Sequence, residues 1–211
     1  MSTFRNRALD QFPMVLLTLI SIIQALALEL LWSKITGTGN LWAVNSTSLV
    51  NWGMISVTFL GILQIWIMYS CLVMGFRWTP TLRDSIFPFI IGIQEFMLVE
   101  FIDTPYRGYW LLTLASVFVS ANIMSHVSFR RAREERDNDL FFRSRARATW
   151  RDFKWAYFVI STLTLLGIVS GWVTDSDIVP LIATVLANVM LLVQILAARR
   201  LWRAILETTE D

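Results

Sequence analysis

Long apolar segments alternate with shorter polar segments along the chain. Each apolar segment has close to the roughly 20 residues that an α-helix needs to cross the hydrocarbon core of a membrane. The alternation therefore predicts an all-α, polytopic integral membrane protein, a single membrane domain built as a bundle of six transmembrane helices. The six predicted helices are residues 13–32, 53–75, 86–102, 108–128, 155–173 and 178–198.

Composition agrees with the membrane class and argues against several others. Hydrophobic residues make up 55% of the chain and charged residues 16%. Soluble domains average about 45–50% hydrophobic and roughly 25% charged residues. The net charge of +2 gives no indication of a nucleic-acid partner. The sequence has one cysteine, one histidine and no nucleotide-binding, nucleophile or zinc motif, so it predicts no cofactor, no metal site and no enzymatic activity.

Positive charge is distributed unevenly between the two sides that six crossings define. Of the 18 Lys and Arg residues, 16 fall at the N-terminus, the second and fourth connections and the C-terminus. Lys34 and Arg107 fall on the other side. Because cytoplasmic loops of membrane proteins carry the excess of Lys and Arg, this distribution predicts that both termini are cytoplasmic.

The segment 129–154 between the fourth and fifth helices is the most basic of these connections. Its apolar residues are interleaved with arginines, which predicts an amphipathic helix lying in the membrane interface. The predicted partner is anionic lipid headgroups, at about 1 kcal/mol per basic residue near the surface; alternatively, the arginines only set the topology. The apolar residues are Leu140, Phe141, Phe142, Trp150 and Phe153, and the predicted lipid-binding residues are Arg143, Arg145, Arg147, Arg151 and Lys154.

Several polar residues fall inside the predicted helices, where ionisable groups are rare and often functional. One carboxylate and four amides lie near mid-membrane, and three further carboxylates lie nearer the outer surface. A charge at the bilayer centre costs ~2.5–3.5 kcal/mol, so the central carboxylate must face protein or water, or stay protonated. The midplane residues are Gln24, Gln64, Gln94, Glu95 and Asn188, and the outer acids are Glu29, Glu100 and Asp103.

The predicted third helix carries three of these acids. At about 100° per residue, Glu95 and Glu100 are about 140° apart with Asp103 between them, so the three acids share one broad sector. Gln24 and Glu29 of the first helix lie opposite this sector. We interpret the arrangement as the path of a cation or proton channel or transporter, in which outer acids attract cations and Glu95 binds or relays one.

Other interpretations of the same residues stay open. The amides also suit hydrogen bonds between helices, at about 0.6 kcal/mol each, and Asp103 suits a salt bridge with Arg107. The chain would then be a non-catalytic scaffold or accessory subunit of a larger membrane complex, and a homo-oligomer fits either interpretation. We favour transport, since a mid-membrane glutamate is a costly way to hold helices together.

Overall fold

The computed structural model describes residues 4–43, 45–79, 81–143, 145, 153–174 and 176–208. These residues form helices and no strand, which confirms the all-α prediction for the described part of the chain. The α-helices are α1 (Phe4–Gly37), α2 (Ser46–Gly75), α3 (Leu82–Glu100), α4 (Arg107–Ala132), α5 (Asp139–Arg143), α6 (Lys154–Ile168) and α7 (Ile178–Thr208), and the π-helical turn η4 (Val169–Val173) continues α6.

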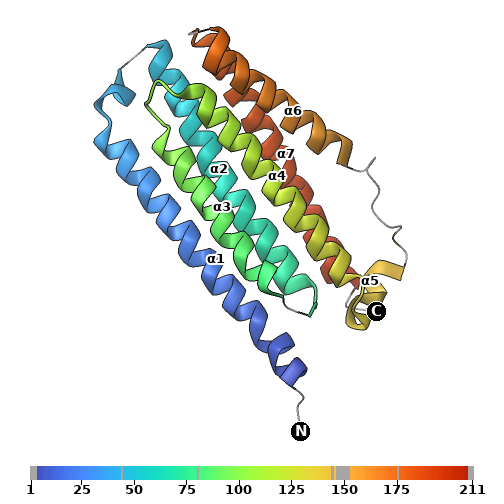
Figure 1. The fold of residues 1–211 in the computed structure, drawn as a ribbon. Helices are drawn as coiled ribbons and strands as arrows, with labels where there is room; N and C mark the ends of the chain where they lie inside the picture. Colours follow the sequence, from blue (N-terminus) through green and yellow to red (C-terminus); the bar gives the residue numbers. More distant parts are fainter. Residues whose placement is uncertain are drawn as a thin grey trace.

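The long helices of the described chain lie side by side along one axis (Figure 1). α1 packs against α2 and α3 at one edge, α7 packs along α2, and α6 packs along α4 at the other edge. α1 begins and α7 ends at the same end of the bundle, which we call the terminal end (Figure 1). α5 and the connection between α2 and α3 also lie there, and the connections from α1 to α2, α3 to α4 and α6 to α7 lie at the opposite end.

Five of the described helices are long and apolar enough to cross a membrane, namely α1, α2, α4, α6 with η4, and α7. The third predicted helix is not among them. α3 has 19 residues, but Arg83, Asp84, Glu95 and Glu100 within it are charged. Asp84 and Glu95 are buried against neighbouring helices, so α3 is more polar than a helix that faces lipid. The six-helix prediction is therefore supported for five helices.

The first and last helices of the described chain extend beyond the predicted apolar segments. α1 begins at Phe4 instead of residue 13, and α7 continues to Thr208 instead of residue 198. The hydrophobic pattern detects only the part of a helix that lies in the hydrocarbon core of the membrane. Backbone hydrogen bonds continue a helix through polar flanks that carry no such signal.

At the opposite end, one carboxylate connects the starts of three helices. Arg107 at the start of α4 forms a salt bridge with Asp177, which directly precedes α7. Asp177 Oδ2 also accepts hydrogen bonds from Ser46 Oγ at 2.7 Å and Thr47 Oγ1 at 3.1 Å, at the start of α2. Arg107 thus pairs with an acid distant in sequence instead of Asp103, because the packing of the helices brings the start of α7 beside the start of α4.

We expect Asp177→Asn to destabilise the protein by about 1 kcal/mol at neutral pH, because hydrogen bonds to a charged group are stronger than neutral ones. The hydrogen bond from Ser46, followed by Arg107 and Thr47, holds the pKa of Asp177 below its usual value, against the opposing effect of burial. A lowered folded-state pKa means that the carboxylate stabilises the fold at neutral pH. This contribution is lost as the pH falls below about 4.

The measurement for Asp177→Asn is the apparent free energy of unfolding in detergent, followed from neutral pH to about pH 3. The difference between wild type and variant should shrink as the pH falls. A difference that stays constant over this range would show that the carboxylate charge of Asp177 does not stabilise the bundle.

At the terminal end, α5 folds back onto the bundle. Phe141 and Phe142 are buried, and their ring centroids lie 4.9 Å and 5.3 Å from that of Phe76 at the end of α2. The prediction of an interfacial amphipathic helix is wrong for these two side chains, because an aromatic partner within the protein covers them in place of lipid. The guanidinium carbon of Arg145 also lies over the Phe141 ring, 3.8 Å from its centroid.

Candidate functional site

Glu95 of α3 is the most deeply buried carboxylate in the described part of the chain, at 1% exposed. Gln24 of α1 donates from Nε2 to both of its carboxylate oxygens, at 3.1 Å and 3.0 Å. Gln24 is itself buried, so the structure joins two of the predicted midplane residues across two helices. One neutral amide does not balance the charge of a carboxylate, which leaves Glu95 able to attract a cation or to hold a proton.

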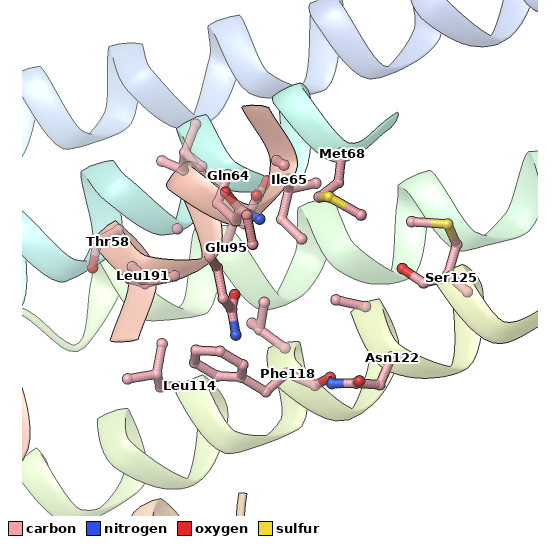
Figure 2. Close-up of a pocket in the computed structure, with 18 of the residues that line it drawn as sticks. Thr58, Gln64, Ile65, Met68, Glu95, Leu114, Phe118, Asn122, Ser125 and Leu191 are labelled. Carbon is pink, nitrogen blue, oxygen red and sulfur yellow. The ribbon is translucent and has the colours of Figure 1, made fainter. Parts of the chain in front are cut away.

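Glu95 lines a cavity of about 320 Å³ that is bounded by α2, α3, α4 and α7. Figure 2 shows Gln64 and Glu95 among side chains that are mostly apolar, including Leu114 and Phe118 of α4. The lining positions on α4 run from Leu114 to Phe129. At about 1.5 Å per residue, these positions extend over about 22 Å, from the region of Glu95 toward the terminal end.

Two buried oxygens in the residues of this wall have no hydrogen-bond partner among the described residues, Gln64 Oε1 and Thr58 Oγ1. Gln64 is 7% exposed and Thr58 1% exposed. Buried polar groups are normally paired, and an unpaired one costs about 1–3 kcal/mol. The Thr58 hydroxyl and the Gln64 amide can also donate, so the Glu95 carboxylate is the group in this wall that favours a donor or a cation.

Two other predicted midplane residues hold helices together. Gln94 donates from Nε2 to Ser116 Oγ at 3.1 Å and to Ser120 Oγ at 3.0 Å, which joins α3 to α4. Asn188 of α7 accepts a hydrogen bond of 2.7 Å from Ser56 Oγ of α2. Neither Gln94 nor Asn188 lines the cavity. Their hydrogen bonds join helices, although Gln94 Oε1 is buried without a partner among the described residues.

The structure does not bring the outer acids to the cavity. Glu29 and Glu100 are exposed on the outside of the bundle. Asp103 follows the end of α3 with φ 58° and accepts a hydrogen bond of 2.8 Å from Asn51 Nδ2. The prediction that three acids share one helical face fails for Asp103, because α3 ends at Glu100 and helical periodicity does not extend past it.

Sequence reasoning did not place several polar residues in the cavity wall. Small polar side chains are common wherever membrane helices pack, so they carry little signal on their own. Positions 58, 61, 65 and 68 of α2 are three or four residues apart and therefore lie on one helical face, which lines the cavity. This spacing is the sequence signal that could have placed Thr58 in the cavity wall. The polar lining residues missed in this way are Thr58, Asn122, Ser125 and Gln194.

Three of the five predicted lipid-binding residues, Arg143, Arg145 and Lys154, lie within the described residues. Arg143 and Lys154 are exposed, and Lys154 Nζ lies 5.9 Å from the ring centroid of Trp155. Arg145 is also exposed, and its guanidinium group donates to the Phe141 carbonyl at 2.5 Å. Arg147 and Arg151, together with Trp150, lie outside the described residues.

The helices define the class of protein. Five helices long and apolar enough to cross a membrane indicate a multi-pass membrane protein. Across the described ranges, no group of three or more His, Cys, Asp or Glu side chains is arranged to hold a metal ion. No known protein family, curated protein or solved structure matches the chain.

Proposed function

We propose that the protein is a cation or proton channel or transporter in which Glu95 binds the transported species. The observation that carries the proposal is the position of Glu95, a buried carboxylate held by one neutral amide in the wall of an elongated cavity. Ionisable groups inside membrane helices are rare and mark ion pathways and proton relays. Glu95 combines such a group with space beside it for an ion.

The proposal includes α3 as a sixth crossing. α3 runs alongside α1, α2 and α4 from the terminal end to the opposite end (Figure 1). Its 19 residues extend over about 28 Å, close to the roughly 30 Å of the hydrocarbon core. Six crossings put both termini on one side, and the arginines of the terminal end make that side the cytoplasm. The cavity then extends from Glu95 toward the cytoplasm, where anionic lipid headgroups bind the exposed basic residues.

A scaffold or accessory subunit is the second candidate, and the hydrogen bonds between helices favour it. Gln94 joins α3 to α4, and Asn188 joins α7 to α2, without any ligand. These contacts explain two of the five midplane residues as parts of the bundle. They do not explain why Glu95 and Gln64 line a cavity, and for that reason transport remains the first candidate.

The test is proton and cation flux into liposomes that contain the purified protein, compared between wild type and Glu95→Gln. Glutamine keeps the size of the side chain and can bond to Gln24, but it has neither the charge nor the exchangeable proton of a carboxylic acid. We expect flux in wild type and a fall in the variant to the level of protein-free liposomes.

Glu100→Gln is the matched control for the flux experiment. It makes the same chemical change at the last residue of the same helix, where the side chain is exposed and does not line the cavity. Glu100→Gln should therefore keep wild-type flux. Folded wild type without flux would exclude transport and favour the scaffold. Flux that survives in folded Glu95→Gln would remove Glu95 from the path.

A further inference from the structure

We infer that the cavity binds a protonated, unbranched alkylamine, with its ammonium group at Glu95 and its alkyl chain along the apolar wall. The inference rests on the proposed function in that it names a class of cation for the same site. It stands on three features of that site, namely the carboxylate of Glu95, the mostly apolar character of the wall and the elongated shape of the cavity.

Glu95 is the only ionisable side chain among the described residues that line the cavity. An ionised carboxylate accepts hydrogen bonds and donates none. A primary ammonium group has three N–H donors and no acceptor. The Glu95 carboxylate can accept from such a cation, whereas an anion would add a second negative charge beside it.

The rest of the wall argues against a bare inorganic cation. Metal cations that lose their water take about six or more oxygen ligands, and selective channels supply such oxygens as rings of carbonyls. The described cavity wall has no such ring, and its polar side chains are interspersed with apolar ones such as Ile65, Leu114 and Leu191. An alkyl chain gains free energy from burial against these side chains, and a bare ion does not.

The shape of the cavity selects among amines. Its volume of about 320 Å³ is at the small end for ligand sites, and it is spread over about 22 Å of helix length. The cavity is therefore narrow, which suits an unbranched chain better than a bulky or multi-ring cation. Phe129 and Leu201 line it near the terminal end, so the chain of the amine would point that way.

The experiment measures binding of hexylammonium to the purified protein in detergent by isothermal titration calorimetry. Affinity should rise about two- to fourfold per methylene from butylammonium to hexylammonium, because each methylene is removed from water. 1-Hexanol has the same chain without charge, and heptanoate has a negative charge. Both should bind about tenfold or more weakly, since neither supplies an ammonium group to Glu95.

Two variants separate the ammonium site from the alkyl site. Glu95→Gln should weaken hexylammonium by about tenfold or more and leave 1-hexanol unchanged. A Cβ at Gly61 would meet no atom within 4 Å, and Gly61 lines the cavity. Gly61→Leu should therefore fill the cavity and weaken every alkylamine while preserving the fold. Glu100→Gln is the control and should bind as wild type does.

The outcomes separate this inference from the transport proposal. Amine binding that depends on Glu95 in a protein without flux would support the amine site and overturn transport. Flux that depends on Glu95, with hexylammonium bound no better than 1-hexanol, would overturn the amine site and leave transport standing. Unchanged hexylammonium affinity in folded Glu95→Gln or Gly61→Leu would also overturn the amine site.

Discussion

Arg131→Ala is expected to destabilise the bundle by about 3 kcal/mol, because it leaves a buried carboxylate without its counter-ion. Arg131 of α4 donates from Nη1 to both oxygens of Asp84, at 2.9 Å and 2.8 Å. The Asp84 side chain is 5% exposed and that of Arg131 21% exposed. Arg131 also donates to Thr81 Oγ1 at 2.6 Å, so one side chain joins the end of α4 to the start of α3.

The measurement is the apparent free energy of unfolding in an SDS titration followed by circular dichroism. In Arg131→Ala/Asp84→Asn, the unpaired charge is gone while asparagine can still accept from the Thr81 backbone N–H, as Asp84 does at 2.7 Å. This double variant should recover about 1 to 2 kcal/mol relative to Arg131→Ala. If it recovers nothing, the loss comes from packing and not from the buried charge.

Arg130→Ala is the matched control for Arg131→Ala. Arg130 is the neighbouring residue on α4, and its ion pair with Glu134 at 3.7 Å joins side chains that are 77% and 67% exposed. Exposed pairs of this spacing contribute about 0.3–0.5 kcal/mol. A similar loss of stability in both variants would contradict the role of burial at Arg131.

The sequence predicts the helices better than it predicts their ends and contacts. Apolar length alone is enough to predict α1, α2, α4, α6 and α7, because crossing hydrocarbon requires it. α3 is detected only weakly, since it packs among other helices and tolerates buried charge. α5 has no such signal: the burial of Phe141 and Phe142 depends on Phe76, which is distant in sequence, and no local pattern reports this contact.

The candidate site is predictable in part for a related reason. The depth of a residue along a helix places Gln24, Gln64 and Glu95 in one layer, and the structure joins Gln24 to Glu95 and puts Gln64 in the same cavity wall. The direction in which each side chain points depends on how the helices are rotated. Glu29 lies on the same helix as Gln24 and is exposed, although both residues lie within one predicted segment.

The contact between α4 and α6 depends on glycine, so Gly108→Ala is expected to destabilise the protein by about 3 kcal/mol or more. A Cβ at Gly108 would lie 2.5 Å from Gly171 Cα and 2.7 Å from the Gly167 carbonyl oxygen. Both are backbone atoms, so the strain can be relieved only by moving the helices apart. Overpacking of a core typically costs about 1–3 kcal/mol, and displacement of a backbone belongs at the upper end of that range.

Gly171→Ala is the matched control, because it adds the same methyl group to the other side of this contact. Its Cβ would lie 3.6 Å from Gly108 Cα, which is an ordinary van der Waals distance. Alanine also favours a helix over glycine by roughly 0.5–1 kcal/mol, so Gly171→Ala should be as stable as wild type or slightly more stable. SDS titrations of the two variants measure the difference. Equal stability of Gly108→Ala and Gly171→Ala would mean that α4 and α6 do not meet backbone to backbone at Gly108.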